Sequence, residues 1–299
     1  MLELVSVVIT TYMRPTEIVV RAIDSVLSQT YSNIELIVVD DSPSNYDGRE
    51  QLRKELEKYK GKIKYVQHEA NMGACVARNT GLKVSTGHYV AFLDDDDEWL
   101  PEKIEQQISK FDDRDIALVY CGRIVVNDTT GMTFEDESEE HTGYVYEKLI
   151  YTNFIGSTSF PLMRKAALIE VGGFDPMMRS AQDYDVWLRL AKKYKVNYVN
   201  RPLVKYHIHN GERISTNFQA RISGQERLIE KNMEYLHQNP QAWWWRHLRL
   251  SLQYSQNKQL RSAVRTWARS CAKQPLKIVT NTNYLVRILY YYFKAKTMR

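Results

Sequence analysis

Short apolar runs of strand length alternate with helix-periodic segments over the first part of this chain. The runs at 4–9, 36–39 and 89–93 contain no charged residue, and apolar residues recur at helical spacing in 19–27 and 74–84. A strand that is apolar on both faces must be covered on both faces, which is typical of a parallel sheet connected by crossover helices. The alternation therefore predicts an α/β fold.

The other expected elements follow from the same periods and from breaker residues. They are a charged helix over 49–60, strands over 63–66 and 117–120, a helix after Pro101, strand-like pieces near 123–126, 157–163 and 196–199, and a helix from Asp183. Beyond residue 218 the pattern is helical throughout. Breaks at Asn239-Pro240 and Gln274-Pro275 predict three helical segments there.

Composition excludes several classes of protein. The chain has 299 residues, 43% apolar and 26% charged, which predicts a globular protein with one substantial core. No stretch approaches the ~20 apolar residues of a membrane-spanning helix, and no basic segment precedes the first apolar run as in a signal peptide. Cys75, Cys121 and Cys271 form no CxxC pair, which disfavours a disulfide framework or a thiolate zinc site. We therefore expect a protein of the reducing cytoplasm.

Charge is divided unevenly along the chain. Residues 1–217 carry 26 Lys and Arg against 33 Asp and Glu, whereas residues 218–299 carry 15 against 3. Four of the six tryptophans also lie in the second region. The two regions are expected to have different roles.

Polar residues follow each predicted strand, at the sheet edge where α/β proteins bind ligands. The first strand ends in Thr10 to Arg14, the second in Asp40-Asp41, and the one over 89–93 in four consecutive aspartates, Asp94 to Asp97. Four adjacent carboxylates repel one another, and a hard divalent cation would balance them. The alternative is a solvated acidic turn before the next helix.

A cation held by one or two carboxylates commonly bridges phosphate oxygens, so a nucleoside diphosphate is the natural ligand. Asp40 or Asp41 would accept a hydrogen bond from a base or ribose, and Thr10 and Tyr12 would frame the base. Arg78 would meet phosphate charge, although a lone helical arginine is often an ordinary surface residue. The sequence contains neither GxxxxGK[ST] nor GxGxxG, so P-loop and dinucleotide chemistry lose their usual support.

Seven motifs follow one another over residues 1–217: VSVVITTYMR, SQTYSNIELIVVDDSP, ANMGACVARNTGL, YVAFLDDDDEWLPEKIE, VGGFD, AQDYDVWLRLA and YHIHNGERIS. In order and spacing this set resembles the family 2 glycosyltransferases. The resemblance implies a GT-A fold, which is a Rossmann-like, mixed and mostly parallel sheet flanked by helices, here followed by a C-terminal helical extension. It implies a catalytic domain over 1–217, with nucleotide-sugar binding in about 1–120 and the acceptor side in about 121–217. Residues 218–299 fall outside the resemblance, and their own composition and periodicity predict a separate basic aromatic helical region.

The resemblance also implies an activity and a set of site residues. The activity is inverting transfer of a sugar from a nucleotide-sugar, with a UDP-sugar favoured, to a glycan or lipid-linked acceptor in cell-surface polysaccharide synthesis, with Mn²⁺ or Mg²⁺. The family's D-x-D motif falls on Asp94, Asp95 and Asp96, with Asp96 and Asp94 as metal ligands and Asp96 as the direct one. Its nucleotide-binding positions fall on Thr10, Tyr12, Arg14, Asp40 and Arg78, to which Asp94 and Asp95 are added.

Asp183 matches the position of the family's general base. An inverting transfer needs a carboxylate that takes the proton of the acceptor hydroxyl. The family's Glu-Asp pair corresponds to Gln182-Asp183 in this sequence. The base, Asp183, is therefore retained. Any contact that the family's Glu makes is in doubt, because Gln182 replaces it. From the residues alone, Asp183 is a helix N-cap, and Asp185 is the nearest competitor for the base.

In the segment Tyr206 to Ser215, His209 matches the position of a possible third metal ligand of the family. The alternative is that His209 is an ordinary histidine of a surface loop. Nearby His207 belongs to the same pattern. The loop Gly172 to Asp175 resembles the family's border between donor sugar and acceptor, although a glycine pair also suits a tight turn. Trp99 is expected either to line the sugar pocket or to pack in the core.

The basic tail carries an apolar aromatic stripe at helical spacing: Tyr284, Leu285, Ile288, Leu289, Tyr292 and Phe293, with Arg287, Lys294, Lys296 and Arg299 as flanking cations. Such a helix suits an anionic membrane surface, which predicts peripheral attachment to the inner face of the cell membrane. The alternatives are a helix packed on its neighbours, an oligomer contact, or a nucleic-acid-binding or scaffold role for the protein. The last alternative leaves the aspartates unexplained, so no nucleic-acid partner is expected.

Overall fold

The computed structural model describes residues 2–136, 140–208, 217–276 and 282–297. The chain forms two compact units, one of Met1–Pro176 with Asp183–Asn210 and the other of Met177–Gln182 with Gly211–Arg299. The domain boundary expected at residue 217 adjoins positions 209–216, which lie outside the described residues. Each unit has buried apolar residues of its own.

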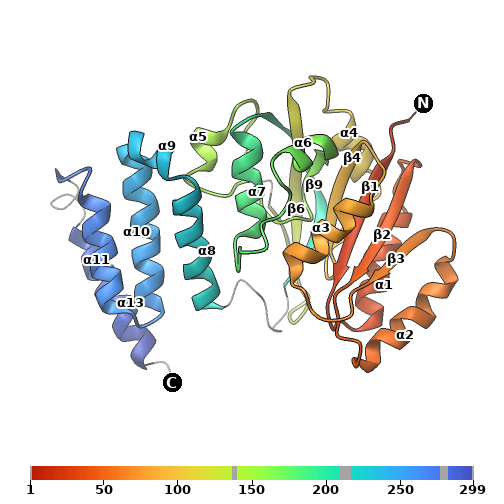
Figure 1. The fold of residues 1–299 in the computed structure, drawn as a ribbon, viewed down its shortest axis with the longest axis horizontal. Coiled ribbons are helices and arrows are strands. Elements are labelled where there is room, and N and C mark those ends of the chain that lie inside the picture. Colours follow the sequence, from red (N-terminus) through yellow and green to blue (C-terminus); the bar gives the residue numbers. More distant parts are fainter. Residues whose placement is uncertain (1, 137–139, 209–216, 277–281, 298–299) are drawn as a thin grey trace. The chain divides into compact units, whose positions relative to one another are not determined.

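A parallel sheet forms the first half of the first unit (Figure 1). Its strands lie in the order β3 (Ile63–Gln67), β2 (Ile34–Asp40), β1 (Val5–Thr11) and β4 (Tyr89–Asp94). In the register of these strands Thr11 lies opposite Asp40 and Thr10 lies opposite Asp94. The polar residues at the strand ends are thereby brought to one edge of the sheet.

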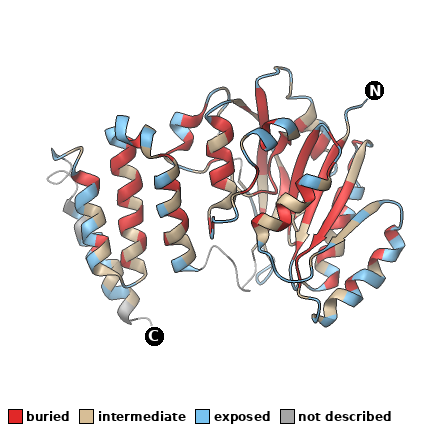
Figure 2. Ribbon diagram, in the orientation of Figure 1, coloured by how far each residue is buried: buried red, intermediate tan, exposed pale blue. Residues whose placement is uncertain are grey.

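Helices cover this sheet on both faces, which explains why β1, β2 and β4 contain runs without charged residues. Alternate residues of β1, Val5, Val7 and Ile9, belong to the core formed with α1 (Thr16–Leu27), α2 (Asp47–Leu56) and α4 (Lys103–Ile108). Val8 points to the other face, where α3 (Ala74–Val84) approaches closely at Gly81. Figure 2 shows β1 and β4 buried along nearly their whole length.

The second half of the sheet is mixed. β8 (Leu162–Arg164) pairs antiparallel with β4 and with β6 (Ile116–Asn127), and β9 (Lys195–Ile208) runs parallel to β6. The short strands β5 (Glu98–Trp99) and β7 (Thr133–Asp136) pair antiparallel with β9 and β6. The pieces expected over 117–120 and 123–126 are one strand with an irregularity at Gly122.

Short helices complete the unit: η1 (Glu57–Tyr59), α5 (Tyr146–Leu149), α6 (Lys165–Glu170) and α7 (Gln182–Ala191). The apolar side of α7 is anchored by Trp187, which is fully buried and donates from Nε1 to the carbonyl oxygen of Gly156 at 3.0 Å. The helix expected from Asp183 therefore has a fixed position in the unit that holds the sheet.

The second unit is mainly helical in its described residues after position 217. It contains α8 (Phe218–Lys231), α9 (Met233–Gln238), α10 (Pro240–Gln256), α11 (Leu260–Cys271) and α13 (Thr282–Thr297). The buried α10 packs against α8, α11 and α13. Two breaks beyond those expected occur, at Asn232, whose side chain bonds back to the carbonyl oxygen of Leu228, and near Lys258, which has a φ of 61°.

The expected fold is confirmed: a mixed α/β sheet flanked by helices is followed by C-terminal helices. Among the helices of the described residues, none combines the length and the apolar character needed to cross a membrane.

The close approach of α3 to the sheet predicts a cost for any side chain at position 81. A Cβ on Gly81 would lie 2.2 Å from Cγ1 of Val8, so Gly81→Ala forces the helix or the strand to move. We expect it to lower the free energy of unfolding by about 1–3 kcal/mol, as overpacking does. Urea denaturation measures this, with Lys83→Ala on the exposed side of α3 as the control. Equal stability of the two variants would contradict this packing.

Candidate active site

The loop after β1 lies beside the loop after β2. Met13 takes a positive φ of 46°, and its backbone N–H donates to Ser42 Oγ at 2.8 Å. Tyr12 is 47% exposed at this point, and Thr10 is partly exposed at the end of the strand. An exposed aromatic ring is thus available at the ligand-binding edge of the sheet.

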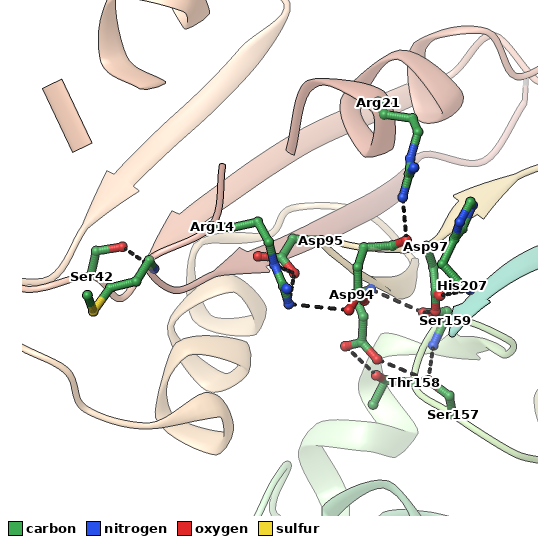
Figure 3. A network of polar contacts seen from close by, with 12 residues as sticks. Arg14, Arg21, Ser42, Asp94, Asp95, Asp97, Ser157, Thr158, Ser159 and His207 are labelled. Atoms are coloured by element: carbon green, nitrogen blue, oxygen red, sulfur yellow. Dashed lines mark hydrogen bonds and ion pairs between the residues drawn. The ribbon is translucent and has the colours of Figure 1, made fainter. Parts of the chain in front are cut away.

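The acidic segment turns sharply after β4 and alternates in exposure. Asp94 and Asp96 are partly exposed, whereas Asp95 and Asp97 are buried. Arg14 Nη2 lies 2.9 Å from Asp95 Oδ1 and 3.3 Å from Asp96 Oδ2, and Arg21 Nη2 donates to the backbone oxygen of Asp96 at 2.8 Å. Figure 3 shows Arg14 and Arg21 reaching this segment from separate positions. This is an ordered acidic loop, so the alternative of a solvated turn is wrong.

Three hydroxyl groups on the loop before β8 hold the other side of the acidic segment. Ser157 Oγ and Thr158 Oγ1 donate to Asp94 at 3.0 and 2.9 Å, and Ser159 Oγ donates to Asp97 Oδ2 at 2.6 Å (Figure 3). Ser159 Oγ also accepts from the Asp94 N–H at 3.1 Å. Sequence reasoning assigned this stretch to a strand and missed its role, although three consecutive hydroxyl residues ahead of an apolar run were the available signal.

The acidic loop retains unfavourable negative charge. Burial raises the pKa of Asp95 to about 6 against the opposing charge of Arg14. Burial, with the charges of Asp94 and Asp96, raises the pKa of Asp97 well above its usual range. Although burial favours a neutral Asp94, the Arg78 guanidinium and the two hydroxyls hold its pKa below the usual value. An added cation at this loop would stabilise the ionised carboxylates.

The described residues fit a divalent cation that is shared with a substrate. Carboxylate oxygens are the ligands preferred by Mg²⁺ and Mn²⁺. Within the described part of the chain no three His, Cys, Asp or Glu side chains gather around one point, and His209, the possible third ligand, lies outside that part. The described residues offer one or two carboxylates to such an ion. Mg²⁺ is usually held in this way, with phosphate oxygens completing its shell. Asp94 is bound by Arg78, Ser157 and Thr158, and Asp96 is paired with Arg14, so a direct contact of Asp96 with a metal ion stays a prediction.

Of the two histidines in the seventh motif, His209 lies outside the described residues. His207 is the last but one residue of β9, with Nδ1 2.7 Å from Asp128 and Nε2 2.8 Å from Glu98. These bonds outweigh burial and raise the pKa of His207. Both ring nitrogens thus face carboxylates, and His207 ties the end of β9 to β5.

Arg78 is buried rather than an ordinary surface residue. Its guanidinium donates to Asp94 at 2.8 Å and lies 5.5 Å from the ring centroid of Phe174. The turn holding Phe174 is fixed on α3, because Asn79 donates to the Phe174 carbonyl at 2.7 Å and accepts from its N–H at 2.9 Å. Gly172 and Gly173, with φ of 87° and 63°, make the tight turn that the glycine pair predicted.

Asp183 and Asp185 have different environments although they are neighbours on α7. Asp185 is 1% exposed and bonds Arg189 Nη2 at 2.6 Å, and Arg189 also donates to the Gly173 carbonyl at 2.7 Å. Asp183 is partly exposed and accepts from the Tyr184 N–H at 2.7 Å. It lies inside the helix, whose first residue is Gln182, so it is not the N-cap.

The charge of Asp183 depends on the rest of the site. Burial raises its pKa to about 6 against the Tyr184 N–H and the charge of Arg78, and Asp94 adds to the shift. Arg78 therefore acts electrostatically on both carboxylates, Asp94 and Asp183. A carboxylate with this pKa is mostly ionised at pH 7 and basic enough to accept a proton.

Asp40 and Asp41 are both buried and bonded to protein groups. Asp40 accepts from the Ser42 N–H at 2.9 Å, from Arg49 Nε at 3.1 Å and from the Tyr65 hydroxyl at 2.7 Å. Asp41 accepts from the N–H groups of Met72 and Gly73 at 2.8 Å, which fixes the start of α3. These bonds shape the loops around the site, and a contact of Asp40 with a nucleotide stays a prediction.

Trp99 packs in the core. It is 3% exposed, its Nε1 donates to the Ser159 carbonyl at 2.9 Å, and Lys103 Nζ lies 3.9 Å from its ring centroid. Of the two expectations for this residue, packing in the core is confirmed. The bond from Trp99 also helps to fix the backbone of Ser159.

The contacts of Ser159 predict a stabilising role. Ser159→Ala removes the hydroxyl between Asp97 and the Asp94 N–H and leaves both buried groups without this partner. We expect the free energy of unfolding to fall by about 1–3 kcal/mol. Urea denaturation tests this against Ser109→Ala, which removes an exposed hydroxyl from α4's C-terminal end. If the two variants lose equal stability, the Ser159 bonds contribute little.

Comparisons with known proteins identify the family to which this chain belongs. The model of "Glycosyl transferase family 2" matches residues 6–172. The putative colanic acid biosynthesis glycosyl transferase WcaA of Escherichia coli is 31% identical over 242 residues, covering 77% of this chain and 82% of WcaA. The putative teichuronic acid biosynthesis glycosyltransferase TuaG of Bacillus subtilis is 30% identical over 243 residues, covering 80% of this chain and 92% of TuaG.

A solved structure agrees on the fold. The crystal structure of S. aureus TarS 1-349 in complex with UDP-GlcNAc superposes with a TM-score of 0.61 at 18% identity, and covers 90% of this chain and 89% of that one. The sheet, the acidic loop and the family match lead to one conclusion: this chain belongs to glycosyl transferase family 2 and is a glycosyltransferase.

Proposed function

We propose that this enzyme transfers a sugar, with inversion, from a UDP-sugar to a hydroxyl of a glycan or lipid-linked acceptor in cell-surface polysaccharide synthesis. The observation that carries the proposal is the position of Arg78, which bonds Asp94 of the acidic loop and acts on the charge of Asp183. A group for diphosphate binding and a candidate base thereby belong to one electrostatic unit. The catalytic domain is proposed to extend over residues 1–217.

The choice of donor and product rests on similarity and on the exposed edge of the sheet. TarS was crystallised in complex with UDP-GlcNAc, and the names of WcaA and TuaG refer to colanic and teichuronic acids. Tyr12 and Thr10 offer an exposed ring and a hydroxyl for a base and ribose. Arg14 holds Asp95 and Asp96 in place beside them.

Asp96, with Asp94 beside it, would hold the Mn²⁺ or Mg²⁺ ion. When bound, such an ion neutralises the charge that develops on a departing diphosphate. Arg78 adds a fixed positive charge at the same edge. Asp94 orients this arginine and is held in turn by Ser157 and Thr158.

Asp183 is proposed as the general base. It takes the proton of the acceptor hydroxyl as the oxygen forms a bond to the anomeric carbon, while the bond from that carbon to the diphosphate oxygen breaks on the opposite face. Asp185 is excluded from this role by its buried pair with Arg189. The charge of the second unit further supports peripheral attachment at the inner face of the cell membrane.

Asp96→Asn should abolish transfer and metal-dependent nucleotide binding without unfolding the protein. The amide removes negative charge from the acidic loop, so the melting temperature should stay the same or rise. Calorimetric titration with UDP and Mn²⁺, followed by a melting curve, checks both parts. Asp112→Asn, an exposed carboxylate, is the control. Full activity of Asp96→Asn would remove it from the metal site.

Asp183→Asn should separate donor binding from chemistry. The amide keeps the shape of the side chain but cannot take a proton, so turnover should fall ~10²–10⁴-fold with donor affinity unchanged. In the unmodified enzyme, turnover should rise with pH through about 6, because Asp183 must be ionised to act. The residual activity of the variant should lack this rise. If Asp185→Asn alone gave this profile, the base would have to be reassigned.

A further inference from the structure

Helix α13 is apolar on two opposite sides. One side packs within the second unit, where Tyr284 contacts the Trp244 ring edge-on at 6.1 Å between centroids and Ile288 is fully buried. The other side is exposed, and its apolar residues follow the spacing i, i+3, i+4, i+7 of a single helix face. We call it the outer face of α13, and it consists of Val286, Leu289, Tyr290 and Phe293, which are 65%, 39%, 56% and 60% exposed.

This arrangement corrects the stripe expected from the sequence. Tyr284 and Ile288 of that stripe lie on the packed side, whereas Leu289 and Phe293 lie on the outer face. The Leu285 side chain lies outside the described residues. One side of α13 is therefore packed within the second unit, and the other side is exposed.

The surroundings of the outer face are cationic. Arg287 and Lys294 are exposed on α13, each one position after a residue of the outer face. Arg261 and Arg265 are exposed on α11, which packs beside α13. The sequence from 235 to 299 contains 12 Lys and Arg and no Asp or Glu. The partner of this face must therefore offer negative charge as well as an apolar layer.

These requirements select one kind of partner. A second copy of the chain would bring two cationic surfaces together, which like-charge repulsion opposes. Nucleic acid supplies phosphates but no hydrocarbon layer for Val286 and Leu289. An anionic lipid interface supplies both, and Tyr290 and Phe293 suit the level of the headgroups.

We propose that α13 lies in the interface of an anionic membrane and inserts the outer face, Val286, Leu289, Tyr290 and Phe293, among the lipids. The proposal deepens the proposed function, because it names the surface by which the enzyme would attach to the membrane. It rests on that function only for its biological purpose. Binding to vesicles requires neither donor nor turnover, so the two ideas can fail separately.

The test is co-sedimentation of the full chain with vesicles of phosphatidylcholine alone or with phosphatidylglycerol added. The unmodified chain should bind the anionic vesicles and release as salt rises, because the attraction is partly electrostatic. Leu289→Glu combined with Phe293→Glu should weaken binding about tenfold or more, since it replaces two inserted apolar groups by charges.

A charge-matched control separates insertion from net charge. Gln238→Glu with Gln241→Glu also adds two negative charges at exposed positions of the second unit, but on α9 and α10 rather than on the outer face of α13. It should lose much less binding than the outer-face variant. Hydrolysis of UDP-sugar and circular dichroism establish that each variant is folded. If Leu289→Glu with Phe293→Glu does not fold, Leu289→Ser with Phe293→Ser replaces it.

Several results would overturn the proposal. They are binding to neither vesicle, equal binding by the outer-face and control variants, and a dimer in light scattering that only the outer-face variant loses. Binding of a single-stranded oligonucleotide in place of anionic vesicles would assign the surface to nucleic acid. Vesicle binding by Asp183→Asn should equal that of the unmodified chain, so loss of catalysis leaves this test intact.

Discussion

Four consecutive aspartates at the end of β4 are the constraint on which the site depends. Their mutual repulsion would open the strand end unless other parts of the chain supplied compensating groups. Arg14 does so from the loop after β1, Arg78 from α3, and the hydroxyls of Ser157 to Ser159 from the loop before β8. The order of strands in the sheet is what brings these distant segments together around one loop.

The same electrostatics separate the roles of similar residues. Asp185 and Asp183 differ because only the former is fully paired, with Arg189. Asp183 keeps a partly exposed carboxylate whose pKa lies at about 6, and Arg78 links its charge to that of Asp94. A substitution of Arg78 would therefore change the pKa values of Asp94 and Asp183 together. These side chains therefore form one electrostatically coupled group rather than a set of independent charges.

The second unit has its own core, which leaves one apolar side of α13 exposed. Its core is built on α10, with Trp243 and Trp244 buried, and this core uses only one side of α13. The exposed side remains apolar among cations, in a sequence without nearby acidic residues. The interfacial role proposed for α13 would account for this combination, whereas stability of the unit alone would favour polar residues there.

Much of this protein follows from the sequence by itself. The bounds expected for α3, 74–84, are those observed, and β1, β2 and β4 agree within a few residues, because strand burial and helix period are local patterns. The acidic loop and the family were also predictable, since both lie in contiguous motifs. Tertiary structure alone decided which carboxylates are paired, that Ser159 supports the acidic loop, and which side of α13 is exposed. Those outcomes depend on partners distant in the sequence, such as Ser159 and Asp97 at a separation of 62, and periodicity does not specify such partners.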